Sequence, residues 1–185
     1  HHDIWDYDVP SQPTFYDVKK DGKIIKALAQ TTKMGFIFLL NRETGEPIFP
    51  VEERNVPQGA VEGDYVTKTQ PFPTKPKPLT PTYLDPDDVF GFTPWDRGYC
   101  KKAAQDLRNE GLYTPPSLEG SVHYPSAIGG ANWGGPAIDS SRNILIANTM
   151  NLSSTIVMVP RSDCDKALKE LARDSVQSRF SALQQ

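Results

Sequence analysis

The chain has 185 residues, of which 37% are apolar and 23% are charged, and its mean hydropathy is -0.50. This composition argues against an intrinsically disordered chain, and 20 basic against 23 acidic residues give a net charge of -3, without the basic excess that a nucleic-acid partner requires. The longest apolar run, residues 36–40, is far shorter than the roughly 20 residues that span a bilayer.

The length suits one domain or a piece of a larger one. Two cysteines, Cys100 and Cys164, allow one disulfide at most, and we favour separate thiols. The first residue is not methionine and no charged-then-apolar leader precedes it, so we expect any leader or membrane anchor to lie outside this sequence. The 17 prolines and 13 glycines limit long helices and favour strands joined by turns.

The first part of the chain predicts short strands. Residues 1–13 are polar and aromatic and predict a loop or a short strand. Asp21-Gly22 predicts a tight hairpin turn, because both residue types tolerate a positive φ. We expect strands at residues 24–30, 35–40 and 47–51, with turns at residues 19–23 and 41–46.

Residues 56–111 predict a long loop and helix excursion. Six prolines between residues 71 and 86 prevent a central strand or a helix interior there. Aromatic side chains at Tyr65, Phe72 and Tyr83 favour a loop that wraps a scaffold over a simple linker. A single helical turn at residues 86–90 and a helix over residues 96–110 follow, with Gly111 as the expected stop.

The last part predicts strands again and then a helical tail. We expect strands at residues 121–124, 135–138, 144–147 and 156–159, with a turn at residues 139–143. Residues 163–185 predict a helical tail or insertion, because Leu168, Leu171, Ala172 and Val176 share one helical face.

These elements predict a mainly β chain with long loops and short helices. The strand, turn and strand of residues 35–51 are typical of the edge of a β-propeller blade. A closed propeller needs at least four blades of four strands, and the long excursions leave space for only two or three blades. We therefore expect an incomplete arc with open ends.

Three segments contain candidate functional residues. The segment HHDIWDYD at residues 1–8 can bind a metal or supply a carboxylate base beside an indole; the alternative is a frayed terminus with solvated acids. Lys33, at the mouth of a strand, can hydrogen-bond an anionic or carbonyl-bearing ligand, although a surface lysine is the more ordinary interpretation. Outside these three segments His123 stands alone, and we expect it to have a structural role.

The third segment is GGANWGG at residues 129–135. Its four glycines allow close backbone approach around the Asn132 amide and the Trp133 ring. The alternative is a structural turn with a packed tryptophan, and the residues alone favour neither. The sequence contains no P-loop, Gly-x-Gly-x-x-Gly, His-Glu-x-x-His, Cys-x-x-Cys or Gly-x-Ser-x-Gly motif.

Taken together, residues 1–161 resemble the quinoprotein dehydrogenases that use pyrroloquinoline quinone (PQQ), in particular the membrane-associated glucose, polyol and quinate/shikimate branch. The remaining tail looks like a variable insertion. The matching segments, in the family's order, are HDIWDYDVPSQP (2–13), TKMG (32–35), NRETGEP (41–47), VPQG (56–59), YTPPS (113–117) and GGANWGG (129–135).

The resemblance implies an eight-bladed propeller that holds PQQ near its axis with Ca²⁺ (or Mg²⁺) against it. Asp6 matches the catalytic base and a metal ligand, Lys33 matches the residue that hydrogen-bonds the quinone oxygens, and Asn132 and Trp133 match the pair that lines the cofactor. It also implies a small polyol or hydroxy-acid substrate, ubiquinone as electron acceptor, and the periplasmic face of the bacterial inner membrane.

The substrate of the protein, and the activity and association of residues 1–185 alone, are further expectations. Asn132 favours quinate/shikimate or polyol oxidation, because glucose-oxidising relatives tend to replace it; glucose oxidation and a non-catalytic propeller scaffold are the alternatives. We expect residues 1–185 to be inactive alone, because the rest of the propeller would supply the other cofactor contacts. Their open strand edges would invite self-association.

Overall fold

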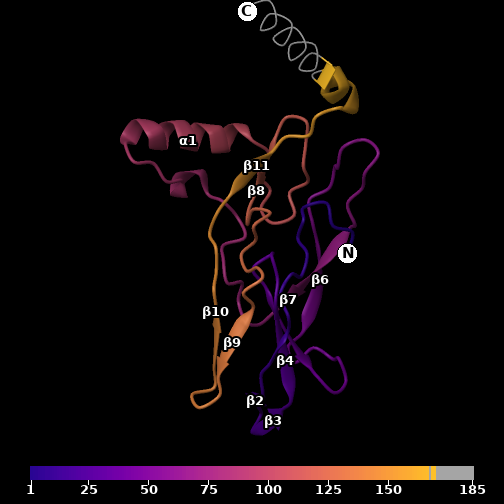
Figure 1. The fold of residues 1–185 in the computed structure, drawn as a ribbon, viewed down its shortest axis with the longest axis vertical. Coiled ribbons are helices and arrows are strands. Elements are labelled where there is room, and N and C mark those ends of the chain that lie inside the picture. Colours follow the sequence, from indigo (N-terminus) through magenta and orange to yellow (C-terminus); the bar gives the residue numbers. More distant parts are fainter. Residues whose placement is uncertain (167, 170–185) are drawn as a thin grey trace, which may run out of the picture.

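The structure, a computed structural model, describes residues 1–166 and 168–169. The described part is mainly β, with one three-stranded and four two-stranded sheets. It is elongated, with α1 near one end and the β2–β3 hairpin at the other (Figure 1). The strands of the first part are β1 (Thr14–Phe15), β2 (Val18–Lys20), β3 (Lys23–Ile25), β4 (Ala27–Thr31), β5 (Ile37–Asn41), β6 (Val51–Asn55) and β7 (Thr69–Pro73). They are followed by η1 (Pro86–Asp88), α1 (Pro94–Asp106), β8 (Ser121–His123), β9 (Pro136–Asp139), β10 (Ile144–Ala147) and β11 (Ser154–Ile156).

The three-stranded sheet β1-β4-β5 is antiparallel and carries the turn on which the candidate site is built. The strand expected at residues 35–40 is confirmed as β5. The single strand expected at residues 24–30 is wrong: β3 pairs with β2 across the Asp21-Gly22 turn, whereas β4 pairs with β1 and β5. The chain therefore changes partners at Lys26.

Alternation along β5 separates two hydrophobic cores. Ile37 and Leu39 pack with the fully buried Ala27 and Ala29 in the first core. Phe36 lies in the second core, and Phe38 packs against it. The second core is mostly aromatic and consists of Trp5, Tyr7, Phe36, Val56, Leu112 and Tyr113. The β4–β5 turn thus lies at the end of a strand that is packed on both faces.

The strand expected at residues 47–51 begins later than predicted. Pro47 makes only an isolated bridge to Leu40, and the strand proper is β6, which pairs with β7. The backbone hydrogen bonds from Val56 to Lys68 and from Thr74 to Pro50 show which residue pairs of this ladder are bonded. The register places Pro71 and Pro73 at the non-hydrogen-bonded pairs between them. Because prolines at such positions need no N–H toward the partner, a hairpin forms inside the predicted loop.

Helix α1 is shifted toward the N-terminus relative to the expected residues 96–110. The Thr93 side chain accepts a hydrogen bond from the Asp96 N–H, and Pro94 occupies the first turn. The helix ends at Asp106, since Leu107 is extended and Arg108 bonds to Gly120 instead. Gly111, the expected stop, adopts a φ of 86° in a later turn.

The last strands form two separate hairpin-like pairs, β9–β10 and β8–β11. The expected strands at residues 121–124, 135–138 and 144–147 are confirmed within a residue or so, as is the turn at residues 139–143. The strand expected at residues 156–159 is displaced: β11 ends at Ile156, and Val157 makes only a bridge to Ser117.

The predicted helical tail is described only at its beginning, where residues 161–166 and 168–169 are helical. The rest of the prediction, including Leu171, Ala172 and Val176, lies outside the described residues. The thiols of Cys100 and Cys164 are free and exposed, as expected. Among the described residues, no helix is long and apolar enough to cross a membrane.

None of the described sheets has four strands, and none closes into a barrel. This arrangement is consistent with a partial propeller, as the strand pattern predicted. The number of blades and the division into a propeller segment, a 56–111 excursion and a 163–185 tail stay predictions.

Candidate active site

Lys33 lies in the tight turn between β4 and β5. The turn is closed by two backbone hydrogen bonds of 3.0 Å, from the Thr32 N–H to the Phe36 carbonyl and from the Gly35 N–H to the Thr32 carbonyl. The Lys33 side chain is only 9% exposed. Because both flanking strands are held by the cores, the stem of this lysine has a fixed position rather than a flexible surface one.

Two carboxylates from the N-terminal segment hold the Lys33 ammonium. Trp5 and Tyr7 are buried in the aromatic core, so the intervening Asp6 and the following Asp8 are directed to the other side. The Lys33 Nζ lies 2.9 Å from Asp6 Oδ2 and 2.5 Å from Asp8 Oδ1. The structure therefore brings together Asp6 and Lys33, as the sequence predicted, and adds Asp8.

The two carboxylates reverse the effect of burial on the pKa of Lys33. Burial lowers the pKa of an ammonium, but the hydrogen bonds and negative charges of Asp8 and Asp6 outweigh it and raise the pKa above its ordinary value. Lys33 is therefore charged throughout the neutral range. An ammonium has three N–H donors, and two carboxylates are in contact with it, which leaves one donor for a ligand.

The position of Asp6 depends on an unusual backbone conformation. Asp6 has a φ of 63°, in the left-handed region that aspartate tolerates better than most residues. Its neighbours hold it there: the Trp5 indole N–H donates to the Thr114 carbonyl at 2.8 Å, and the Tyr7 hydroxyl donates to the Pro125 carbonyl at 2.6 Å. The Asp6 side chain remains 67% exposed. A non-glycine residue kept in this conformation, with an accessible carboxylate, is typical of functional sites.

A glycine loop covers the Lys33 backbone and stem. The Gly130 N–H donates to the Lys33 carbonyl at 2.7 Å. Gly129 has a φ of 84°, and a Cβ at this position would lie 2.6 Å from the Lys33 Cγ. Nearby, the buried hydroxyls of Thr80 and Ser126 have no hydrogen-bond partner among the described residues. The close approach of Gly129 to the Lys33 side chain explains why the loop needs glycine there.

Asn132 and Trp133 lie on the same loop. The Asn132 amide donates to the Ile128 carbonyl at 2.5 Å and accepts from the Trp133 N–H at 2.8 Å, so it stabilises the loop itself. Trp133 is 82% exposed. The tryptophan is therefore not packed among the described residues, whereas the hydrogen bonds of Asn132 are those expected of a structural turn. The loop presents a free aromatic face next to the lysine turn.

His123 contributes a buried neutral group behind the site. It is 3% exposed, its ring centroid lies 4.8 Å from that of Tyr7, and neither ring nitrogen has a partner among the described residues. Burial lowers its pKa to about 4, so the imidazole is neutral near pH 7. The sequence suggested a structural histidine here but gave no signal for its unpaired nitrogens.

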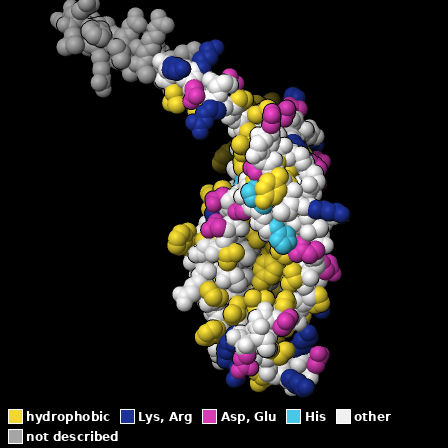
Figure 2. Space-filling view, turned by 90° about the vertical axis from the view of Figure 1, so that its right-hand side faces the viewer, with side chains coloured by type: hydrophobic (Ala, Val, Ile, Leu, Met, Phe, Trp, Pro, Cys, Tyr) yellow, Lys and Arg dark blue, Asp and Glu magenta, His cyan; other side chains and the backbone are white. Residues whose placement is uncertain are grey.

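The N-terminal histidines bind neighbouring acids. The His1 Nε2 lies 3.1 Å from Glu53, and the His2 Nε2 lies 2.9 Å from Asp64 while its ring stacks on Tyr65 at 4.1 Å. Figure 2 shows histidine side chains with acidic neighbours on this face. The two histidines are therefore not frayed, whereas the side chains of Asp6 and Asp8 remain 67% and 52% exposed, as the alternative of solvated acids expected. Among residues 1–166 and 168–169, no cluster of three or more histidine, cysteine or acidic side chains could hold a metal.

Comparison with known proteins identifies the class. The family model described as "PQQ: Glucose/ethanol/alcohol dehydrogenase, beta-propeller domain" matches residues 1–185. The chain therefore belongs to the PQQ-dependent dehydrogenase β-propeller family, as its motifs predicted. No solved structure matches the chain significantly.

The names of the curated relatives include several different substrates. The chain is 44% identical over 163 residues to the quinoprotein glucose dehydrogenase of Gluconobacter oxydans, covering 87% of this chain and 20% of the relative. It is 40% identical over 151 residues to the glycerol dehydrogenase large subunit of Gluconobacter thailandicus, covering 80% and 20%. It is 31% identical over 184 residues to the quinate/shikimate dehydrogenase (quinone) of Acinetobacter baylyi, covering 99% and 23%. The chain thus spans about a fifth of the length of these relatives.

The described residues suit part of a PQQ site. The free N–H of Lys33 is a donor for quinone oxygens, and the open face of Trp133 suits a flat ring. For a metal the fit is poorer, since Asp6 can offer only a single carboxylate and Lys33 already occupies one of its oxygens. The other metal ligands would have to come from outside the described residues.

The contact between Gly129 and Lys33 predicts the effect of adding one methyl group. In the full-length protein, Gly129→Ala should displace the Lys33 stem and strain the backbone, at a cost of about 1–3 kcal/mol. We expect a lower melting temperature and weaker PQQ binding, measured by fluorescence titration. Gly134→Ala is the matched control, because Gly134 has open space around it and no positive φ. Equal behaviour of the two variants would contradict the contact.

The buried His123 predicts a pH dependence of stability. Its pKa of about 4 in the folded state lies below its ordinary value of 6.5, so the unfolded chain binds the proton first as the pH falls. Stability should therefore decrease between about pH 6.5 and pH 4, by roughly 3 kcal/mol in total. Melting temperatures of the full-length protein at pH 7 and pH 5 should differ less in His123→Phe than in the wild type. An unchanged difference would show that His123 is not buried neutral.

Proposed function

We propose that this chain is a segment of a PQQ-dependent dehydrogenase that oxidises a hydroxyl group of a cyclic polyol or sugar alcohol. The observation that carries the proposal is the Lys33 ammonium between Asp6 and Asp8, beside the loop of Asn132 and Trp133. Membership of the family supports the cofactor. The remaining cofactor contacts would come from parts of the protein outside residues 1–185.

Each residue has a role that its chemistry allows. PQQ, when bound, supplies the two-electron acceptor of the oxidation. Asp6, whose carboxylate is exposed, accepts the proton that the substrate hydroxyl loses. Lys33 donates its remaining N–H to the quinone oxygens and stabilises negative charge there. Trp133 offers a ring face, and Asn132 shapes the loop that positions it.

A divalent cation, Ca²⁺ or Mg²⁺, is part of the proposal only through Asp6. The carboxylate oxygen of Asp6 that does not bond Lys33 is the atom available as a metal ligand. Hard cations of this kind prefer several oxygen ligands. Asp6 would therefore be one of several ligands, the others lying elsewhere in the protein.

Within the family, we favour quinate or shikimate as substrate because the chain keeps Asn132. The 31% identity to a relative named quinate/shikimate dehydrogenase (quinone) is compatible with this substrate. The higher identity to relatives named for glucose and glycerol supports a neutral sugar or polyol as the second candidate. Comparing turnover of quinate, glucose and glycerol by the full-length protein would decide between them.

The acceptor and location follow from the same proposal. Ubiquinone as acceptor is supported by a relative whose name includes a quinone. The periplasmic face of the inner membrane is the location that the resemblance to the membrane-associated branch implies. Inactivity of the isolated segment and its self-association through open strand edges stay predictions. A non-catalytic scaffold is the alternative, and substrate-dependent turnover by the full-length protein would exclude it.

Removal of the Asp6 carboxylate tests the assignment of the base. In the full-length protein reconstituted with PQQ and Ca²⁺, Asp6→Asn should lower substrate-dependent dye reduction about 10²–10⁴-fold, because the hydroxyl proton loses its acceptor. Asp17→Asn is the matched control, since Asp17 is an exposed acid paired with Arg42, away from Lys33. Asp8→Asn should mainly weaken PQQ binding, because Asp8 positions Lys33 without serving as the base. Wild-type turnover in Asp6→Asn would contradict the assignment.

A further inference from the structure

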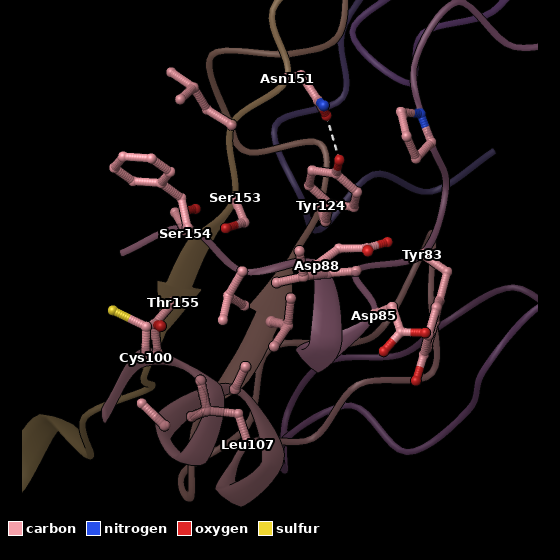
Figure 3. Close-up of a pocket in the computed structure, with 18 of the residues that line it drawn as sticks. Tyr83, Asp85, Asp88, Cys100, Leu107, Tyr124, Asn151, Ser153, Ser154 and Thr155 are labelled. Atoms are coloured by element: carbon pink, nitrogen blue, oxygen red, sulfur yellow. Dashed lines mark hydrogen bonds between the residues drawn. The ribbon is translucent and has the colours of Figure 1, made fainter. Parts of the chain in front are cut away.

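A pocket of about 810 Å³ lies on the other side of β8 from the lysine site. It is lined by the segment around η1, by α1, and by β8 and β11 with the residues that precede β11, and it is partly open to solvent. Figure 3 shows Asn151, Ser153 and Ser154 facing Tyr83 and Asp85 across it, with Cys100 and Leu107 at the end formed by α1. Its volume lies in the range of about 300–1,000 Å³ that small-molecule sites occupy.

Alternation along β8 separates this pocket from the candidate active site. Successive side chains of a strand point to opposite faces. Val122 and Tyr124 line the pocket, whereas His123 between them contacts Tyr7 of the aromatic core. The pocket is therefore a site of its own, not part of the surroundings of Lys33.

Part of the pocket lining is apolar. Ala103 and Ala104 of α1, together with Val122 and with Leu107 just after the helix, form an aliphatic floor. Aromatic rings stand at its margin, where they can pack against C–H groups of a ligand. They belong to Tyr83, Phe90 and Tyr99, which are exposed, whereas Tyr124, which also lines the pocket, is buried.

The polar part of the lining offers donors and acceptors that the described chain leaves free. The hydroxyls of Ser153, Ser154 and Thr155 make no hydrogen bond among the described residues, and all three residues are exposed. Tyr124 donates to the Asn151 carbonyl oxygen, which leaves the Asn151 NH₂ group free. Across the pocket, the Asp88 carboxylate is likewise without a partner in the described part.

This lining selects a chemical class of ligand. No lysine, arginine or histidine is among the described residues that line the pocket, and Asp85 and Asp88 are acidic, so an anionic ligand is disfavoured. A cation uses acceptors only and would leave the hydroxyl and amide donors unmatched. A hydroxyl group both donates and accepts, and a ring with C–H faces suits the aromatic margin. We propose that this pocket binds a neutral polyhydroxylated small molecule, separately from the redox site.

Cys100 provides a local reporter of binding. Its thiol lines the pocket and is free and exposed, whereas the free, exposed Cys164 is not among the residues that line it. A ligand in the pocket should shield Cys100 from alkylation and leave Cys164 unaffected. The two cysteines can be followed in one reaction by peptide mass spectrometry.

The experiment uses the full-length protein without PQQ, so that its outcome does not depend on the proposed redox function. Alkylation by iodoacetamide is measured in the presence of D-glucose, D-glucosamine or D-glucuronate. These sugars share a pyranose ring and differ in charge. At ten times its dissociation constant, D-glucose should slow Cys100 alkylation about tenfold by mass action. D-glucuronate should protect it less because the acidic lining disfavours an anion. D-glucosamine should also protect it less because a cationic group leaves the donors of the lining unmatched.

Two variants locate the effect. Ser153→Ala and Asp88→Asn should each weaken protection by D-glucose at least severalfold, while Ser140→Ala, an exposed serine in the β9–β10 turn, should leave it unchanged. Stronger protection by D-glucosamine or D-glucuronate would overturn the ligand class. Absence of protection by all three sugars, equal protection of Cys164, or a Cys100 that does not react in the free protein would overturn the site.

Discussion

The arrangement of the site depends on one ion cluster, in which the Lys33 ammonium bridges the carboxylates of Asp6 and Asp8. An almost buried ammonium with no counter-charge would be costly, because desolvation favours its neutral form. The two carboxylates keep Lys33 charged and bind the N-terminal segment to the β4–β5 turn. Electrostatics thus joins two parts of the chain that lie 27 positions apart.

Packing on either side makes this cluster rigid. Trp5 and Tyr7 alternate with the two acids and anchor them to an aromatic core, with hydrogen bonds to the carbonyls of Thr114 and Pro125. Gly129 allows the loop of Asn132 and Trp133 to lie directly on the Lys33 stem. A carboxylate, a cationic donor and an exposed aromatic side chain are consequently held on neighbouring segments of the chain, which is the arrangement that the proposed oxidation requires.

Local signals predicted much of this, and tertiary contacts explain the rest. Strand β5 and the Asp21-Gly22 turn follow from residue type alone, and the family motifs directed attention to Asp6 and Lys33. The β6–β7 hairpin was missed because prolines are compatible with a strand only when the register is known. The end of α1 depends on the bond from Arg108 to Gly120, which no local pattern shows. Asp8 had a weak signal, the same alternation that directs Asp6, whereas the pocket beside α1 depends on contacts between distant segments.

The most direct test of the account is the affinity of the full-length protein for PQQ when the ammonium of Lys33 is removed. If Lys33 donates a charge-assisted hydrogen bond to the quinone, Lys33→Met should weaken binding about 10- to 100-fold. Lys77→Met, at an exposed lysine, should bind like the wild type. A Lys33→Met protein with an unchanged melting temperature and wild-type affinity for PQQ would contradict the central claim.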